Sequence, residues 1–83
     1  MSWDLADVVG LAGGAMMVAA FAYSNLAKAL NLVVFNLLNL IGAILLIASL
    51  AVHFNLASMV LEIVWAAIAL LGLVRAFSKK APA

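Results

Sequence analysis

Three long apolar runs take up most of this sequence and leave the chain few ways to fold. They lie at about residues 7–24, 30–52 and 56–77, and short polar turns separate them. An α-helix of about 20 apolar residues crosses a hydrocarbon core of about 30 Å, so each run is long enough to span a bilayer. We therefore predict an all-α membrane protein in which residues 1–83 form a single unit. Three transmembrane helices pack in one bundle without β structure, and a basic tail follows at residues 78–83.

The composition excludes several classes of function. The 83 residues are 71% hydrophobic and 8% charged, whereas a soluble domain is about 45–50% apolar and about 25% charged. The three spans leave no soluble domain to carry catalysis, and a formal charge of +1 does not suggest nucleic acid. Cysteine is absent and the chain has one histidine, His53, so no metal-ligand set is expected. We expect neither an enzyme nor a cofactor or metal site.

Glu62 is the most unusual residue, because it places a carboxylate inside the third apolar run. A carboxylate at membrane depth costs about 2.5–3.5 kcal/mol on insertion scales, so it normally faces protein or a water-filled cavity. Trp65 follows three residues later on the same helical face. The apolar run around Glu62 continues to Leu73 with no other charge, so no lysine or arginine lies at the depth of Glu62 to pair with it. Glu62 is therefore a candidate solute- or proton-binding residue, with Trp65 in the wall of its pocket.

Asn36 and Asn39 are the second polar feature, inside the second apolar run. An amide in hydrocarbon must find partners, so these side chains face another helix or a cavity. Two interpretations remain open, because such amides serve either as interhelical hydrogen bonds or as the lining of a solute route. At about 1.5 Å per residue, Asn39 and Glu62 differ in depth by only about 7 Å. One polar pocket would hold both if the second and third spans pack together.

Glycines mark the expected helix contacts. Gly10 and Gly14 form a G-x-x-x-G motif, which lets two membrane helices approach closely. Packing within the chain and dimerisation explain this motif about equally well. Gly42 lies in the polar stripe of the second span, and Gly72 lies in a small-residue stripe of the third. All four glycines are candidates for helix packing or a dimer interface.

Charge asymmetry predicts the orientation in the membrane. Three spans place all the basic residues on one side, namely Lys28, Arg75, Lys79 and Lys80. The other side carries Asp4, Asp7 and His53, and Asp4 is expected to cap the first helix. By the positive-inside rule we expect the N-terminus to lie outside the membrane and the C-terminus to lie in the cytoplasm.

Two short runs carry a resemblance to a known family. Residues 37–43 (LLNLIGA) and 61–68 (LEIVWAAI), together with three short spans, resemble the bacterial SemiSWEETs of the PQ-loop superfamily, and more closely their small uncharacterised relatives. The resemblance implies a bundle whose third helix packs between the first and second, and a homodimer around a central translocation route. It places Glu62 where the family has a substrate-binding asparagine, and Gly42 on the family's second-helix glycine.

The departures from this pattern concern the solute. Residues 23–25 (YSN) stand where the family has Pro-Gln, and Leu46 stands where an aromatic residue would stack on a sugar ring. A carboxylate in place of an amide favours a proton-coupled or cationic solute over a sugar. We expect a homodimeric half-transporter for a small polar solute, surrounded by membrane lipid. The alternative is a structural or accessory subunit of a larger membrane complex, in which Glu62 and the asparagines are interhelical contacts.

The orientation can be tested directly. A reporter fused after Ala83 that works only in the cytoplasm is expected to be active, because the Lys and Arg residues hold that end inside. The complementary reporter, which works only outside the membrane, is expected to be silent at the same position. The reverse pattern would contradict the predicted orientation.

Overall fold

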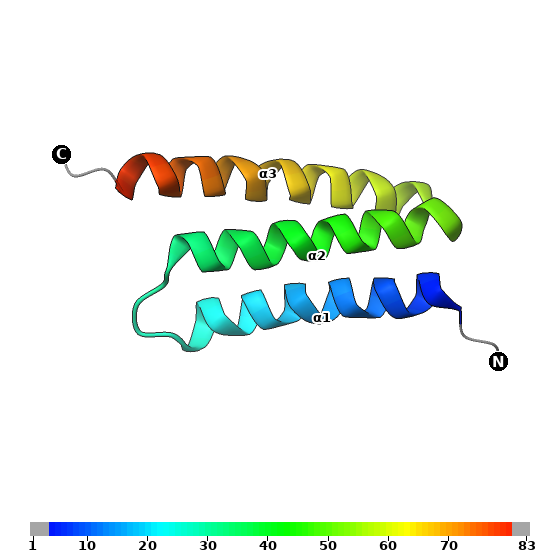
Figure 1. Cartoon of the computed structure of the whole chain (residues 1–83), viewed down its shortest axis with the longest axis horizontal. Helices are drawn as coiled ribbons and strands as arrows, with labels where there is room; N and C mark the ends of the chain where they lie inside the picture. The colour runs from blue at the N-terminus through cyan, green and yellow to red at the C-terminus, as the bar shows by residue number, and fades with distance from the viewer. Residues whose placement is uncertain (1–3, 81–83) are drawn as a thin grey trace.

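The computed structural model describes residues 4–80 as three helices without a strand. They are α1 (Leu5–Leu26), α2 (Leu32–Val52) and α3 (Leu56–Lys80), shown in Figure 1. All three are long and apolar enough to cross a membrane, which confirms the predicted all-α architecture with three membrane-length helices. The basic tail begins as helix, because α3 continues to Lys80, while residues 81–83 lie outside the described part of the chain.

Polar side chains define where the helices begin. The Asp4 carboxylate accepts a hydrogen bond from the Asp7 N–H at 2.9 Å, and the Asp7 carboxylate accepts one from the Asp4 N–H at 3.2 Å. This reciprocal capping box confirms Asp4 as the cap of α1. Asn31 caps α2 through its side-chain oxygen. The Asn55 side chain accepts from the Ser58 N–H at the start of α3.

α2 is the central helix, with α1 on one side of it and α3 on the other (Figure 1). Among the described residues, α1 and α3 do not contact each other. The expectation that the third helix packs between the first and second is therefore wrong for this chain. The connection at residues 27–31 spans at most about 17 Å, which is barely two interhelical distances of 8–10 Å. A short connection favours α1 and α2 as direct neighbours.

Glycines hold α1 against α2. A Cβ atom added to Gly13 would lie 2.6 Å from the Gly42 carbonyl oxygen, and one added to Gly42 would lie 2.8 Å from the Gly13 carbonyl oxygen. The two backbones therefore touch at this point, as small residues allow in membrane helices. One turn away, Gly10 packs on Ser49, whose hydroxyl donates to the Ala6 carbonyl at 2.7 Å. A Cβ at Gly14 would meet nothing within 4 Å.

Small residues also form the contact between α2 and α3. Ala69 and Ala76 are buried on α3, and Ala43 is fully buried on α2. Gly72 lies against the Asn36 side chain, and a Cβ at Gly72 would overlap the amide group. In the described part of the chain every large apolar residue retains some exposure, so small and polar side chains make the closest interhelical contacts.

The positions of the two contacts around α2 give the three helices a bent arrangement. Gly42 faces α1 and Asn36 faces α3. These residues are six apart in sequence, which places them about 120° apart around an α-helix. With interhelical distances of about 9 Å, the axes of α1 and α3 then lie about 16 Å apart, in agreement with the lack of contact between them. We call the space between α1 and α3, with Asn39 and Leu46 of α2 at its floor, the V groove.

The backbone contact at Gly13 should be sensitive to a single methyl group. Gly13→Ala is expected to lower the free energy of unfolding by about 1–3 kcal/mol, because the added Cβ would overlap Gly42. The measurement is reversible unfolding in mixed detergent micelles, at a dilution where the chain is monomeric. Gly14→Ala is the matched control, since its Cβ meets open space and alanine favours helix. Equal effects of the two substitutions would contradict this account of the α1–α2 contact.

Candidate functional site

One hydrogen bond joins the polar residues of α2 and α3. The Trp65 indole N–H donates to the Asn39 side-chain oxygen at 2.9 Å, and the Asn39 amide donates to the Phe35 carbonyl at 2.9 Å. Asn39 is therefore satisfied on both sides, although it is only 7% exposed. Trp65 is 42% exposed, so its ring also forms part of the outer surface of α3.

Asn36 has one satisfied group and one that faces α3. Its amide donates to the Leu32 carbonyl at 2.8 Å, four residues earlier on the same helix. Its side-chain oxygen lies against the backbone at Gly72 and accepts no hydrogen bond from a described residue. The glycine is therefore what allows this amide to fit between the two helices.

A small cavity opens beside these amides. It has a volume of about 110 Å³, and its lining residues are Phe35, Asn36, Asn39, Trp65, Ile68 and Ala69. The α2 residues of this lining lie on the side of the helix that forms the floor of the V groove. The cavity is large enough for a few water molecules or a small solute, and its amides supply the polar partners that such a molecule needs.

Glu62 lies apart from this cavity. The residue is 8% exposed, and its Oε1 atom is buried without a hydrogen-bond partner among the described residues. Glu62 does not line the cavity, and it lies about 120° around α3 from Ile68, which does. The carboxyl group therefore occupies the opposite edge of the contact between α2 and α3. The structure brings Asn36, Asn39 and Trp65 together but leaves Glu62 outside their pocket.

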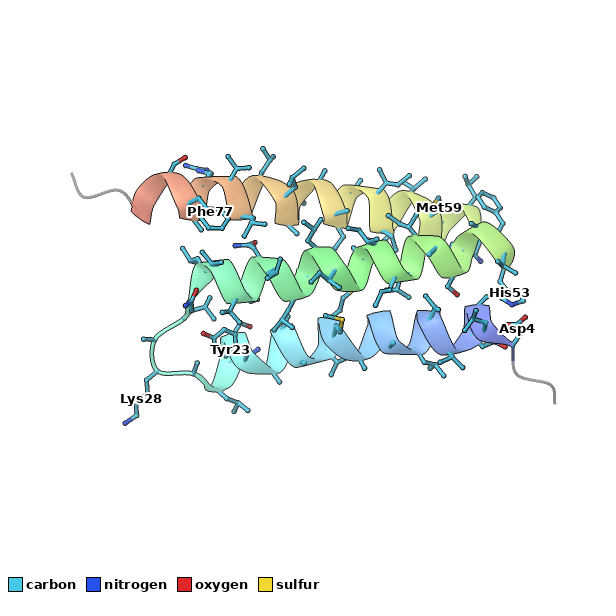
Figure 2. The ribbon with its side chains drawn as sticks, viewed as in Figure 1. Asp4, Tyr23, Lys28, His53, Met59 and Phe77 are labelled. Atoms are coloured by element: carbon cyan, nitrogen blue, oxygen red, sulfur yellow. The ribbon has the colours of Figure 1, made fainter. Side chains whose placement is uncertain are left out.

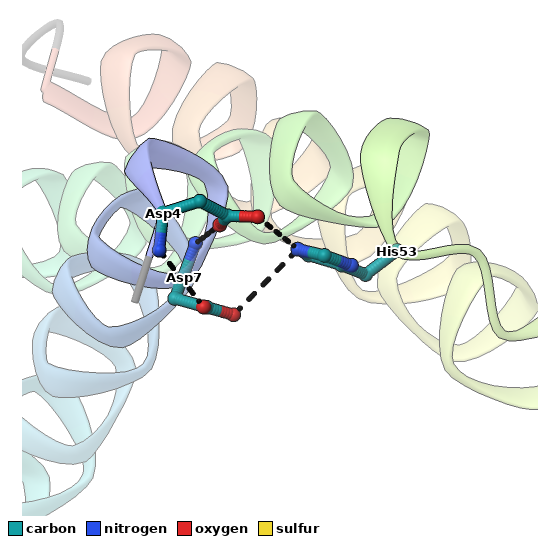
Figure 3. A group of neighbouring side chains, drawn as sticks. All are labelled: Asp4, Asp7 and His53. Carbon is teal, nitrogen blue, oxygen red and sulfur yellow. Dashed lines mark hydrogen bonds and ion pairs between the residues drawn. The ribbon is translucent and has the colours of Figure 1, made fainter. Parts of the chain in front are cut away.

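A second polar cluster joins the start of α1 to the end of α2, at one end of the bundle. His53 Nε2 lies 2.9 Å from Asp4 Oδ2 and 3.7 Å from Asp7 Oδ1, as Figure 3 shows. The pKa of Asp4 is lowered, chiefly by the hydrogen bond from the Asp7 backbone N–H and further by His53. Lys28 lies at the opposite end of the bundle (Figure 2).

This cluster is the arrangement that the sequence pattern did not predict. One carboxylate or imidazole atom from each of Asp4, Asp7 and His53 lies within 4.8 Å of the other two, which is close enough to share a metal ion. Forty-nine positions separate His53 from Asp4, so only the packing of α1 on α2 brings them together. All three side chains are partly exposed, and both carboxylates already serve the cap of α1.

The outer edge of the α1–α2 contact carries a larger, mostly apolar hollow. Its volume is about 360 Å³, and it lies near the same end as His53. Leu5, Val9, Ala48 and Val52 are among its lining residues, with Asp4 and Ser49 at polar positions. Such a surface suits the hydrocarbon part of a lipid rather than a polar solute.

The fold defines a small all-helical protein with three helices of membrane-spanning length. The model of an uncharacterised protein family matches residues 6–80, and the chain belongs to that family. The match covers α1 from its second residue onward, all of α2 and α3, and both connections. No curated protein and no solved structure matches the chain.

The sequence analysis assigned the close helix contact of α1 to the Gly10–Gly14 motif and did not identify Gly13 as a contact residue. Gly13, rather than Gly14, makes the backbone contact with α2. The available signal was a stripe of small residues at helical spacing, formed by Ala6, Gly10, Gly13 and Ala20. The indole–amide bond also needed the structure, because its two residues lie 26 positions apart.

The Trp65–Asn39 bond should give a measurable coupling energy. In a double-mutant cycle with Trp65→Phe and Asn39→Leu, we expect a stabilising coupling of about 0.6 kcal/mol, and at most about 1.7 kcal/mol. The measurement is unfolding of the four forms in one detergent mixture. Ile68→Val in place of Trp65→Phe is the control, because Ile68 cannot hydrogen-bond. A coupling within error of that control would show that the bond does not stabilise the protein.

Proposed function

We propose that the protein is half of a membrane transporter for a small polar solute, and that it acts as a homodimer in a bacterial inner membrane with its N-terminus outside. The observation that carries this proposal is the cavity lined by Asn36, Asn39 and Trp65. It lies between two membrane-length helices, inside the apolar spans of both, where polar groups are costly and are usually retained for function.

The hydrogen bonding around the cavity suits exchange with a solute. The Asn36 oxygen accepts no hydrogen bond from a described residue, so it is available to a donor. The Asn39 oxygen accepts only from Trp65, and that indole is part of the cavity wall. A solute with both donor and acceptor groups can take over the indole–amide bond at little net cost, because one hydrogen bond replaces another.

Glu62 adds a titratable group to the same helix contact. Its buried oxygen lacks a partner, and the described residues of α2 and α3 offer no cation beside it. Proton binding would remove a charge from the edge of the contact opposite the cavity, and would change how closely α3 packs on α2. This arrangement supports a proton-coupled or cationic solute, with Glu62 acting through the α2–α3 contact and Asn36 and Asn39 meeting the solute.

A structural or accessory subunit is the second candidate, and one observation favours it. Both asparagine amides donate to carbonyl groups four residues earlier on their own helix. These bonds satisfy the amide N–H groups without a solute. Asparagines that only help to hold two helices together need no other partner for these groups. In that function the Glu62 carboxyl would meet a lysine or arginine of a larger complex, where a charge-assisted bond is about twice as strong as a neutral one.

Glu62 variants separate the two functions. Glu62→Gln keeps the shape and the hydrogen-bonding capacity of the side chain but removes its titrating proton. The transporter function predicts a folded, normally assembled Glu62→Gln protein whose uptake has lost its pH dependence or is abolished. The measurement is pH-dependent uptake of small cations and zwitterions into proteoliposomes, beside the oligomeric state.

Glu62→Leu and Asn39→Ala complete the experiment. Asn39→Ala should reduce uptake at every pH, because it removes a group that lines the cavity. The accessory function predicts that no form takes up solute, and that Glu62→Gln weakens recovery of the larger complex. A Glu62→Leu protein that assembles, transports and responds to pH like the wild type would exclude any role for this carboxyl group.

A further inference from the structure

We propose that the cavity lined by Asn36, Asn39 and Trp65 binds a small ammonium cation that carries N–H groups, such as a primary alkylammonium ion. The inference rests on the proposed function, because it names the class of solute that the same cavity would take. Four features lead to it: the unpartnered amide oxygen, the aromatic rings in the wall, the small volume, and the acidic residue Glu62 in the same helix contact.

The amide oxygens of the lining can accept hydrogen bonds from a solute. Asn36 is only 9% exposed, and its oxygen accepts no hydrogen bond from a described residue. A carbonyl oxygen has two lone pairs, and the Asn39 oxygen uses one of them for the Trp65 indole. Both oxygens can therefore accept from a solute without the loss of a hydrogen bond that the structure already has.

The nitrogen atoms of the lining already donate. Both asparagine amides donate to carbonyl groups of α2, and the Trp65 indole donates to Asn39. Among the described residues that line the cavity there is no lysine, arginine or histidine. A carboxylate or phosphate group in the cavity would therefore meet no positive charge. Because a buried charge without a partner is costly, this lining disfavours an anion.

One ammonium nitrogen can reach both amide oxygens. Asn36 and Asn39 are three residues apart on α2, which places their Cβ atoms about 5–6 Å apart on one side of the helix. Charge-assisted N–H···O bonds are about 2.7–2.9 Å long, so two of them from one nitrogen span nearly 5 Å. A quaternary ammonium ion has no N–H group and cannot form this bridge. A calcium ion needs about 6–8 oxygen ligands, which two amides do not supply.

Aromatic side chains form part of the cavity wall. Phe35 and Trp65 both line it, beside Ile68 and Ala69. An aromatic ring attracts a cation that lies over its face within about 6 Å of the ring centre. A sphere with the volume of the cavity is about 6 Å across, so a solute inside it lies close to both rings. The apolar part of the wall suits the alkyl group of an alkylammonium ion.

The volume limits the solute to a few atoms. An apolar cavity of about 150 Å³ holds benzene, which has six carbon atoms. The cavity of about 110 Å³ therefore suits a solute of about two to five non-hydrogen atoms. Methylammonium, ethylammonium and propylammonium lie within this range, whereas a sugar ring with its hydroxyl groups does not.

Glu62 supplies the negative charge that a cation inside the spans requires. It is the only acidic residue of α2 and α3, and it lies one turn along α3 from Trp65. Its buried Oε1 atom has no hydrogen-bond partner among the described residues. α2 carries no titratable side chain, and the described residues of α1 do not contact α3, so no other ionisable group faces Glu62 from a neighbouring helix. The attraction acts across the α2–α3 contact, because Glu62 does not line the cavity.

Nuclear magnetic resonance of the full chain, in nanodiscs of zwitterionic lipid, tests the inference. Trp3→Phe leaves Trp65 as the only tryptophan, so the indole N–H that donates to Asn39 gives a single signal. We expect ethylammonium to shift this signal in a saturable way with a Kd of about 1–10 mM, because a ligand of three non-hydrogen atoms cannot bind much more tightly.

Three solutes of similar size are the controls. Tetramethylammonium has the charge without an N–H group, ethanol has a donor without the charge, and acetate has the opposite charge. Tetramethylammonium and ethanol should bind at least five-fold more weakly than ethylammonium, and acetate should give no saturable shift. The proposal is overturned if ethylammonium does not bind, or if any of the three binds as tightly.

Substitutions locate the bound ion. Asn36→Leu keeps the approximate size of the side chain but removes its oxygen, and should weaken ethylammonium binding at least five-fold. Glu62→Gln removes the negative charge and should weaken it at least three-fold. Ser49→Ala is the matched control on the same helix, because the Ser49 hydroxyl donates to α1 and does not line the cavity. An unchanged Kd in Asn36→Leu would show that the ion binds elsewhere and would overturn the proposal. The comparison of solutes does not depend on the folding of these variants.

Uptake into proteoliposomes separates this inference from the proposed function. Binding of ethylammonium without uptake would support the ammonium site and contradict transport. Binding and uptake of a neutral or anionic solute in place of ethylammonium would leave the cavity as a transport site and overturn its assignment to an ammonium ion.

Discussion

The contact between the backbones of Gly13 and Gly42 is the constraint on which the arrangement of the three helices depends. It fixes the height of α1 against α2, and it occupies the side of the central helix that carries Gly42. Since no side chain lies between the two backbones, neither helix can rotate without a collision. α3 must therefore use another side of α2, and the side that carries Asn36 is the one it contacts. The bend of the three-helix unit follows from this division of the α2 surface.

The polar groups in the α2–α3 contact differ in their hydrogen-bond partners. Each asparagine amide donates to a carbonyl of its own helix, and Asn39 also accepts a hydrogen bond from Trp65 across the contact. These local bonds form in any environment where the helix forms, so they do not require the tertiary fold. Glu62 differs, because its buried oxygen has neither a local nor a cross-helix partner among the described residues. The free energy that α3 gains by packing on α2 must therefore exceed the cost of burying this group.

The sequence predicted the three helices well, because apolar length and capping chemistry are local properties. Asp4 as a cap and the apolar runs could be recognised without any knowledge of the fold. The order of the helices could not be recognised, since it depends on which glycine touches which backbone. The resemblance to SemiSWEETs implied a different neighbour for the third helix than the described contacts have.

The candidate site was predictable only in part, for a similar reason. Helical spacing placed Asn36 and Asn39 on one stripe and Glu62 and Trp65 on another. It did not show on which edge of the α2–α3 contact each residue would fall. A rotation of about 60° around α3 separates the tryptophan that meets Asn39 from the carboxyl group that does not. Rotations of that size are set by packing against a neighbour, and a single sequence does not contain them.

The two contacts at opposite ends of α1 and α2 also affect how the chain enters a membrane. At one end the Tyr23 hydroxyl accepts a hydrogen bond from the Asn31 N–H, and at the other His53 bridges to Asp4. Together with the glycine contact between them, these bonds close α1 and α2 into a helical hairpin. α3 has no such bond at the end near Lys28 among the described residues. The first two helices can therefore insert together as one preformed unit during synthesis, and α3 then joins a surface that is already folded.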